Sequence, residues 1–362
     1  MSGMYGMNIK MAIYGESHGA SIGLILDGLP PGLILDLAAI DKEMARRAPG
    51  KNALSTARSE SDAFVIQSGF FEGKTTGTPL CVMIKNSDQH SRDYSILKDK
   101  MRPGHADYAG FVHYKWCNDY RGGGAFSGRL TAPLVFAGAV AKQALAAYGI
   151  VIGAHILQIA DVKEPNFNPL GVSEQVLTSL NNKEFSVMDD EIGALMQQRI
   201  LEAKAECNSV GGVIETMAIN IPVGIGNPYF DSIESRLSHA LFSIPAVKGV
   251  EFGEGFGFAD LSGAEANDEL YYDNDQVKAY SNHNGGITGG ISNGMPIVFR
   301  VAVKPTPSIA REQRTISLEN KKNTTLTIVG RHDPCIVQRA VPVVEAVAAW
   351  TLWDLLLESK KW

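Results

Sequence analysis

Histidines near serine or arginine occur in two short motifs whose residue types could bind anions or move protons. The first, GESHG, sets Ser17 directly before His18. The second, RPGHAD, sets Arg102 three residues before His105. Imidazole titrates near neutral pH and arginine keeps a fixed positive charge, so the second pair suits proton transfer beside an anion. A surface loop with solvated charges is the other interpretation of this motif.

GESHG also matches the G-x-S-x-G pattern of serine hydrolases, in which the serine lies between a strand and a helix. The context argues against this function, because Ser17 lies early in the chain and residues from Gly23 onward are predicted to form another strand. The hydrolase triad would also need an aspartate and then a histidine, whereas His332 precedes Asp333. A serine hydrolase that uses Ser17 and a glycine-bounded turn without chemistry both stay open.

Two further motifs could bind a phosphate or supply a base. RGGG begins at Arg121 and precedes a predicted helix, so its backbone N–H groups could face an anion, although a flexible hinge fits equally. In GRHDPC, Arg331 and Asp333 lie two residues apart and could face the same side of an extended chain. One could then bind an anion while the other accepts a proton, or the pair could form a buried ion pair.

Composition argues against several other classes of protein. The net charge is −6 with no dense Lys/Arg block, so we expect neither a nucleic-acid partner nor a membrane surface. The four cysteines form no CxxC pair and the eight histidines form no HExxH pattern, so we expect no metal site and no disulfide framework. The N-terminus lacks a signal-peptide pattern, and the apolar stretch 130–147 is predicted to be a buried helix. A cytoplasmic protein fits these features.

The elements that must position these motifs mix strands and helices without regular βα alternation. Strands are predicted at residues 8–14, 23–26, 63–70, 78–85, 150–159, 212–222, near 247, 296–303 and 324–329. Helices are predicted at residues 37–47, capped by Asp36, and at 131–148, 188–207, 230–242 and 341–359. Residues 86–130 form a long polar, glycine-rich tract of the kind that is functional or mobile, and 161–185 and 253–295 are rich in loops. The pattern predicts an α+β fold in a single large domain, 1–362.

Ten segments, taken in order, resemble the chorismate synthase family. They are YGESHG at 14–19, DGLPPG at 27–32, RRAPG at 46–50, SGFFEGKTTGTPL at 68–80, RPGHADY at 102–108, DYRGGG at 119–124, AVKGVEFG at 246–253, SNHNGGITGGISNG at 281–294, KPTPSI at 304–309 and GRHDPCIVQRAVPVVEA at 330–346. The match extends over essentially the whole chain, and an ordered series is far more specific than any one segment.

The resemblance implies a carbon–oxygen lyase that converts 5-enolpyruvylshikimate-3-phosphate into chorismate and phosphate by 1,4-elimination. It implies reduced FMN as cofactor, with NADPH as a candidate reductant if the enzyme reduces its own flavin. The implied fold is a β-α-β sandwich of mixed or antiparallel sheets and helices. The implied assembly is a homotetramer, a dimer of dimers, acting on a small-molecule substrate.

The resemblance also assigns roles to residues. His18, with Ser17, matches the motif whose histidine lies by the substrate phosphate. His105 matches the histidine that protonates reduced flavin, and Asp333 matches the aspartate that acts as a base with flavin N5. The arginines that match binders of substrate, NADP or flavin anions are Arg47, Arg102 and Arg331, and Arg129 is added as a cation nearby. The positions that match FMN-contacting segments are Ala125, Phe126, Ser127, Pro245, Ala246, Gly289, Lys304, Pro305, Thr306, Pro307, Ser308 and Arg331.

Three departures from the family pattern remove cationic or polar ligands. AFS at 125–127 stands where much of the family has Arg-Ser-Ser, Ala53 replaces a second arginine beyond RRAPG, and Pro245 replaces an asparagine. Cations that could compensate are Lys51, Arg58 and Arg129. A homologue that binds flavin without catalysis is therefore a further alternative.

Overall fold

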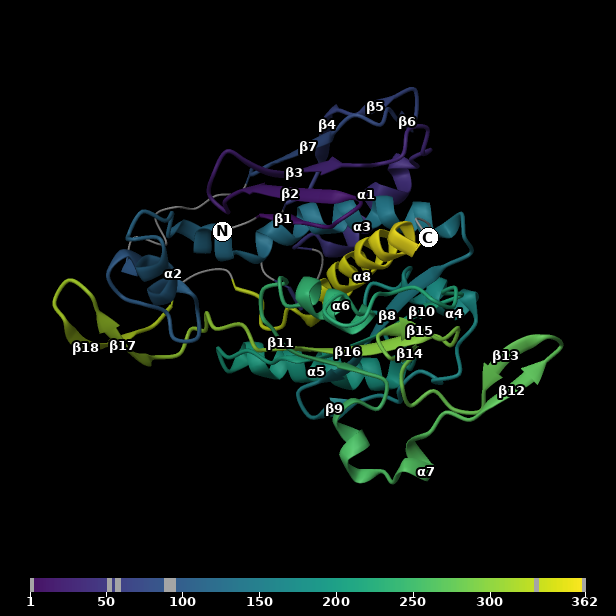
Figure 1. Ribbon diagram of the computed structural model, residues 1–362. Helices are drawn as coiled ribbons and strands as arrows, with labels where there is room; N and C mark the ends of the chain where they lie inside the picture. The colour runs from purple at the N-terminus through teal and green to yellow at the C-terminus, as the bar shows by residue number, and fades with distance from the viewer. Residues whose placement is uncertain (1–2, 51–53, 56–59, 88–95, 329–331, 360–362) are drawn as a thin grey trace.

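The computed structural model describes residues 3–50, 54–55, 60–87, 96–328 and 332–359. Two five-stranded sheets enclose a layer of helices (Figure 1). All pairs of neighbouring strands within these two sheets are antiparallel. The α+β class and the β-α-β sandwich implied by the resemblance are thus confirmed.

The first sheet carries the N-terminal part of the chain. Its strands, in spatial order, are β1 (Met4–Tyr5), β2 (Lys10–Gly15), β3 (Ser21–Asp27), β7 (Leu80–Lys85) and β4 (Phe64–Ser68). Successive side chains of a strand point to opposite faces, and Ile22, Leu24 and Leu26 of β3 are fully buried while Ile25 is exposed. One face of this sheet therefore packs on the helices.

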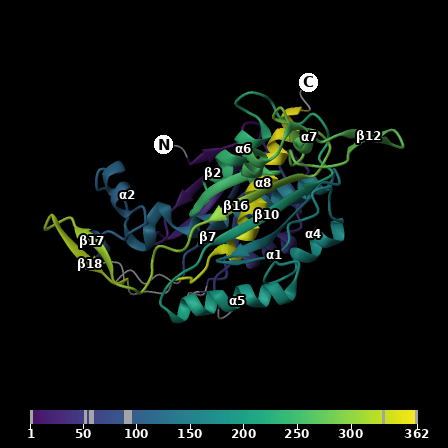
Figure 2. The same ribbon diagram turned by 90° about the horizontal axis from the view of Figure 1, so that it is seen from below.

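The second sheet lies on the other side of the helical layer. Its strands, in spatial order, are β11 (Val247–Phe252), β16 (Ile297–Val303), β10 (Gly212–Ile219), β8 (Val151–Ile159) and β9 (Val162–Lys163). The helices α4 (Glu174–Leu180) and α5 (Asp190–Ala205) lie outside this sheet, away from α8 (Figures 1 and 2). The predicted insertion 161–185 contains the edge strand β9 of this sheet and the helix α4, which packs on β8.

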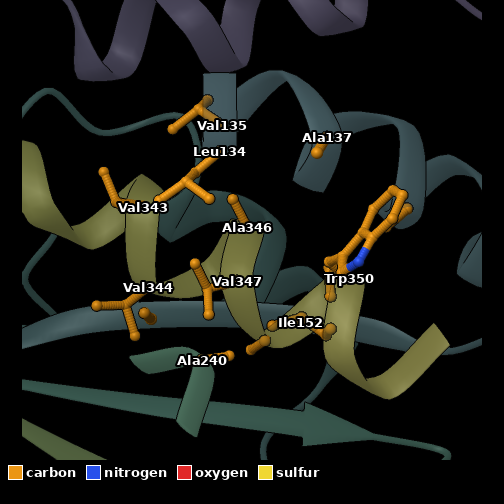
Figure 3. Packing of buried hydrophobic residues seen from close by; sticks show 14 of the residues in the cluster. Leu134, Val135, Ala137, Ile152, Ala240, Val343, Val344, Ala346, Val347 and Trp350 are labelled. Atoms are coloured by element: carbon orange, nitrogen blue, oxygen red, sulfur yellow. The ribbon is translucent and has the colours of Figure 1, made fainter. Parts of the chain in front are cut away.

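Two long helices form the centre of the core. In the packing between α3 (Thr131–Ala146) and α8 (Val337–Ser359), Leu134 lies beside Val343 and Ala346 (Figure 3). Gly138 allows this close approach, because a Cβ added there would lie 2.1 Å from the Ala346 Cβ. The apolar stretch 130–147, predicted to be a buried helix, thus forms α3, and its glycine lets two helix backbones come together.

Helix α1 (Leu37–Arg47) begins and ends where the sequence predicts. The Asp36 side chain accepts a hydrogen bond of 3.1 Å from the Ala39 N–H and so caps the first turn. Arg46 and Arg47 lie in the last turn, where positive charge interacts favourably with the helix dipole. This helix delivers Arg47, which is 2% exposed, to the interior.

Helix α8 begins at Val337, four residues before the predicted start at residue 341, and includes Pro342. The added turn is helical because Val337, Ala340 and Val341 are buried in the core. The stability gained by burying them outweighs the backbone hydrogen bond that proline cannot donate. By length and composition alone, α8 could cross a membrane, but 94% of its most apolar window is buried inside the molecule. It is the central helix of the core.

Two elements lie in tracts that were predicted to lack regular structure, and a third, β18 (Lys322–Leu326), overlaps the strand predicted at 324–329 and pairs with a strand that was not predicted. The polar tract contains α2 (Asp107–His113), and the glycine-rich tract contains the hairpin of β12 (Leu270–Asp273) and β13 (Gln276–Ala279). The hairpin of β17 (Gln313–Ser317) and β18 docks on residues 99–101, where the Thr315 hydroxyl donates to the Met101 carbonyl. Both ribbon views place β17–β18 beside α2, at the opposite end from β12–β13 (Figures 1 and 2).

The remaining described elements are short. They are the strands β5 (Phe70–Phe71), β6 (Lys74–Thr75), β14 (Ile287–Thr288) and β15 (Ile291–Ser292), the helices α6 (Ile233–Leu241) and α7 (Gly263–Ala266), and the 3₁₀ turns Arg121–Phe126, Gly128–Leu130 and Gly255–Asp260.

Candidate functional site

The turn Arg121–Phe126, here called the glycine loop, lies between two of the motifs that the sequence singles out. Gly122, Gly123 and Gly124 all have positive φ, at 59°, 87° and 52°. A Cβ added to Gly122 would lie 2.5 Å from His18 Nε2, and one added to Gly123 would lie 3.3 Å from His105 Nε2. The two histidines therefore lie against neighbouring residues of one loop; a side chain at Gly122 would clash with His18, and one at Gly123 would be in tight contact with His105.

Ser17 and His18 lie in the turn between β2 and β3. Ser17 is fully buried, His18 is 5% exposed, and the Ser17 N–H donates to the Gly124 carbonyl at 3.3 Å. Within the part of the chain that the structure describes, the Ser17 hydroxyl has no hydrogen-bond partner. Because this turn joins two antiparallel strands, it is not the strand-to-helix elbow of a serine hydrolase, and that alternative is wrong.

Asp107, the first residue of α2, organises the RPGHAD loop. Its carboxylate accepts hydrogen bonds from Arg102 Nε and Nη2, each at 2.8 Å, and lies 2.6 Å from His105 Nδ1. Burial acts to raise the pKa of Asp107, but hydrogen bonds from Arg102 and His105 hold it well below its usual range. The loop therefore contains a fixed carboxylate, arginine and histidine.

His332 joins this loop from the C-terminal part of the chain. Burial, followed by the positive charge of Arg102, lowers the pKa of His332 to about 4, although the neighbouring Asp333 acts to raise it. His105 is also close enough to lower this pKa. His332 is therefore a neutral imidazole at pH 7, and its buried Nε2 has no hydrogen-bond partner among the described residues.

Asp333 is held by an arginine of α8. Arg339 Nη1 lies 2.5 Å from Asp333 Oδ2, and Arg339 Nε donates to the Arg47 carbonyl at 3.0 Å. Burial lowers the pKa of Arg339, and the charge of Asp333 opposes that change. The ion pair of Asp333 is thus made with Arg339. Its predicted neighbour Arg331 lies outside the described residues.

Arg47 and Arg129 share a buried carboxylate. Arg47 Nε donates to Asp62 at 2.8 Å, and Arg129 Nη1 also contacts Asp62, while Arg129 Nε lies 2.8 Å from Glu60. Burial acts to raise the pKa of Asp62, but the two arginines hold it below its usual value. Arg129 Nε also donates to the Asn86 side chain at 3.0 Å. This cluster fixes both guanidinium groups.

Asn86 links that cluster to the turn that carries Ser17. Its amide Nδ2 donates to the carbonyls of Glu16 and Gly19, at 3.0 and 2.9 Å. The turn and Arg129 are therefore held by one side chain. The sequence interpretation gave no role to several residues that contact the predicted ones; they are Glu60, Asp62, Asn86 and Arg339, together with Asp107 and His332, which stand inside two of its motifs.

The KPTPS segment packs on the RPGHAD loop. Lys304 Nζ donates to the Gly104 carbonyl, and Arg102 Nη1 donates to the Ser308 hydroxyl at 3.3 Å. The Lys304 N–H donates to the Ala246 carbonyl at 3.0 Å, which brings in the segment of Pro245. Burial, with the charge of Lys248, lowers the pKa of Lys304. Several segments expected to contact a flavin thus meet beside His105.

Phe126 and Gly289, two further residues expected to contact the flavin, lie in different parts of the structure. Phe126 closes the glycine loop and lines a cavity of about 590 Å³ with Ala106, Gly110 and Tyr114. Gly289 lies in the tight turn between β14 and β15, where a Cβ on the next residue, Gly290, would touch the Ser232 side chain. Among the described residues, no backbone hydrogen bond joins Gly289 to the RPGHAD loop, and Figure 1 shows β14–β15 well away from α2.

The cluster combines fixed cations, histidines and four carboxylates, those of Glu60, Asp62, Asp107 and Asp333, beside the glycine loop. Such an arrangement can bind several anionic groups while a histidine or an aspartate moves a proton. Among the described residues, no group of three or more His, Cys, Asp and Glu could hold a metal ion.

Comparisons with known proteins agree along the whole chain. The family model for chorismate synthase matches residues 9–357. A chorismate synthase of Pyrococcus abyssi is 46% identical over 359 residues, which cover 99% of each chain. One of Dehalococcoides mccartyi is 43% identical over 359 residues, which cover 99% of this chain and 98% of that protein.

The fold is also similar to that of a solved chorismate synthase. A crystal structure of chorismate synthase superposes with a TM-score of 0.77 at 31% sequence identity. The superposition covers 98% of this chain and 93% of that one.

Proposed function

Because the chain belongs to the chorismate synthase family and has the activity of that family, we propose that substrate and reduced FMN meet at the glycine loop. The activity is the 1,4-elimination of phosphate from 5-enolpyruvylshikimate-3-phosphate, which gives chorismate. The observation that carries the proposal is the packing of His18 and His105 against Gly122 and Gly123. This packing sets a phosphate-binding motif beside a proton-transfer motif.

The flavin side of the proposed site is formed by the RPGHAD loop, KPTPS and the end of the glycine loop. Lys304 and Arg102 tie KPTPS to that loop through Gly104 and Ser308, which supports a common binding surface. Bound in reduced form, FMN supplies electron density that helps phosphate to leave. The chain would hold the flavin phosphate with cations and with backbone N–H groups of these turns. Arg331 is proposed as a further ligand from the family resemblance alone.

Proton movement is assigned to two positions. We assign His105 to hold or deliver a proton at Nε2, the ring nitrogen that faces Gly123. Asp333 is assigned as the acceptor of the proton that leaves the substrate ring, with Arg339 holding its carboxylate in place. The neutral His332 lies beside both without adding positive charge at pH 7.

The substrate side is assigned to Ser17, His18, Arg47 and Arg129. A buried hydroxyl and an imidazole can both donate to a phosphate oxygen. The cluster around Asp62 fixes the two arginines, so little side-chain entropy is lost when an anion binds near them. The developing charge on phosphate then meets donors that are already in position.

We also propose a homotetramer and a cytoplasmic location. Tyr229, Phe230 and Phe256 are 88–90% exposed, and Leu270 and Tyr272 on the projecting β12 strand are largely exposed as well (Figure 1). Exposed apolar groups of this size favour contact with another copy of the chain. Light scattering should give about four times the chain mass of 39.0 kDa. A monomer mass would contradict the assembly.

The proposed chemistry is tested by anaerobic turnover of the enolpyruvyl substrate with chemically reduced FMN. Turnover with reduced FMN, and none with oxidised FMN, is expected. A parallel assay with oxidised FMN and NADPH decides whether the chain reduces its own flavin. FMN binding without turnover would contradict the catalytic proposal and favour the flavin-binding homologue that the departures at Ala53 and Ala125 suggest.

A further inference from the structure

The carboxylate of Asp107 holds two of the proposed active-site residues at once. Its Oδ1 lies 2.6 Å from His105 Nδ1 and accepts from Arg102 Nη2 at 2.8 Å. Its Oδ2 accepts from the backbone N–H of Arg102 at 3.0 Å and from Nε at 2.8 Å. Asp107 is 7% exposed and begins α2, so the helix fixes its position. A single buried carboxylate thus sets the geometry of the whole loop.

The contacts decide which ring nitrogen of His105 carries a proton. Asp107 is ionised near neutral pH, because its pKa is held well below the usual range, so it can only accept hydrogen bonds. At 2.6 Å from this carboxylate, His105 Nδ1 must be the donor. Arg102 Nη2 lies farther from Nδ1, at 3.2 Å, and is itself a donor. The proton therefore lies on Nδ1 in both charge states of the ring.

The other ring nitrogen faces the glycine loop. A Cβ added to Gly123 would lie 3.3 Å from His105 Nε2. This nitrogen therefore faces the loop at which the ligands are proposed to bind. The hydrogen bond made by one ring nitrogen decides the protonation of the other. Only Nε2 is then able to exchange a proton with a ligand.

We propose that Asp107 is a positioning residue that fixes His105 with a protonated Nδ1 and directs Nε2 toward ligands at the glycine loop. The inference rests on the proton-transfer role proposed for His105. The same carboxylate accepts hydrogen bonds from three N–H groups of Arg102, so Asp107 also fixes the position of that cation. No reacting atom is touched by Asp107 itself.

The first test is the variant D107N assayed with reduced FMN. Asparagine keeps the shape of aspartate but presents an amide donor, which favours the wrong tautomer of His105. We expect kcat to fall by about 10²–10⁴-fold, the range for a lost or misdirected general acid. KM for the substrate should change far less, because its proposed binding groups remain. D107E should recover part of kcat, since it restores a carboxylate.

The matched control is D161N. Asp161 pairs with Arg199 on the exposed side of the molecule, so D161N removes the same charge and also breaks an aspartate–arginine pair. It should leave kcat at the wild-type value. A kcat of D107N within about twofold of wild type, with H105A strongly impaired, would overturn the positioning role.

The tautomer gives a readout that does not depend on turnover. Solid-state ¹⁵N NMR of histidine-labelled protein, with H105A used to assign the signal, should show a protonated Nδ1 in the wild type. It should show loss of that tautomer in D107N. An unprotonated Nδ1 in the wild type would overturn the inference. Wild-type activity of H105A would instead contradict the proposed role of His105, while the NMR signal still decides what Asp107 does.

Discussion

Gly122 is the position at which one added methyl group would disturb the site most directly. Its φ is +59°, and a Cβ there would lie 2.3 Å from His18 Cδ2 and 2.8 Å from Ser17 Oγ. A left-handed backbone costs a residue with a side chain about 1–2 kcal/mol. Carbon atoms in contact lie about 3.5–4 Å apart, so the His18 ring must move by more than 1 Å. A displacement of that size costs about 100-fold in rate.

We therefore expect G122A to lose about 100-fold in kcat with reduced FMN, while its melting temperature falls by only a few degrees, at about 2–4 °C per kcal/mol. The matched control is G149A. Gly149 also has positive φ, at +71°, but a Cβ there meets no atom within 4 Å. G149A should show a similar fall in melting temperature and wild-type kcat. If G122A also kept wild-type kcat, the packing of His18 on the glycine loop would not control catalysis, and the reasoning would be refuted.

Two further predictions concern buried carboxylates. Asp333→Asn should lose turnover by orders of magnitude and still bind substrate in a titration with oxidised FMN; near-normal rates would remove Asp333 from the mechanism. Burial acts to raise the pKa of Glu345, but Arg46 and Lys142 hold it at about 2, below the ordinary 4.5. Its contribution to stability is therefore full above pH 4.5 and is lost as the pH falls toward 2. At pH 7, E345Q should have a free energy of unfolding lower than wild type by about 3–5 kcal/mol, and a lower melting temperature. Between pH 5 and 2, its melting temperature should change less with pH than that of wild type. The same pH dependence in both proteins would contradict this.

Long, strongly patterned elements could be predicted from the sequence, and short ones could not. The helix at 37–47 has a capping aspartate and a Pro-Gly stop, and its bounds are confirmed as α1. The hairpin β12–β13 was missed because glycine and asparagine dominate its surroundings. Its turn residues Asn274 and Asp275 both have positive φ, a conformation that such residues tolerate, so Asn-Asp between alternating residues was a usable signal. Helix α2 has seven residues, too few for a periodic pattern.

The site was predicted through its motifs but not through the partners of those motifs. Asp62 follows SES in the chain and has no pattern that marks it as buried, yet it is enclosed by Arg47 and Arg129. Asp107 stands within the RPGHAD motif, and its contact with His105 depends on a tight turn that sequence spacing alone does not define. Contacts between residues far apart in sequence depend on the sheets and helices that bring them together.

The pairing of arginines with carboxylates changes how this site must bind anions. Arg102 is held by Asp107, and Arg47 and Arg129 are held by Asp62, so none of these guanidinium groups has to be ordered when a ligand arrives. A buried arginine without a partner would be costly, and a carboxylate partner removes that cost but cancels much of the local positive charge. The remaining attraction for phosphate must therefore come from neutral donors as well, and the unpartnered hydroxyl of Ser17 beside the glycine loop is one such donor among the described residues. A neutral donor of this kind does not depend on the side chain at position 125, where this chain has alanine, whereas the three glycines before it are set by their positive φ and their close contacts.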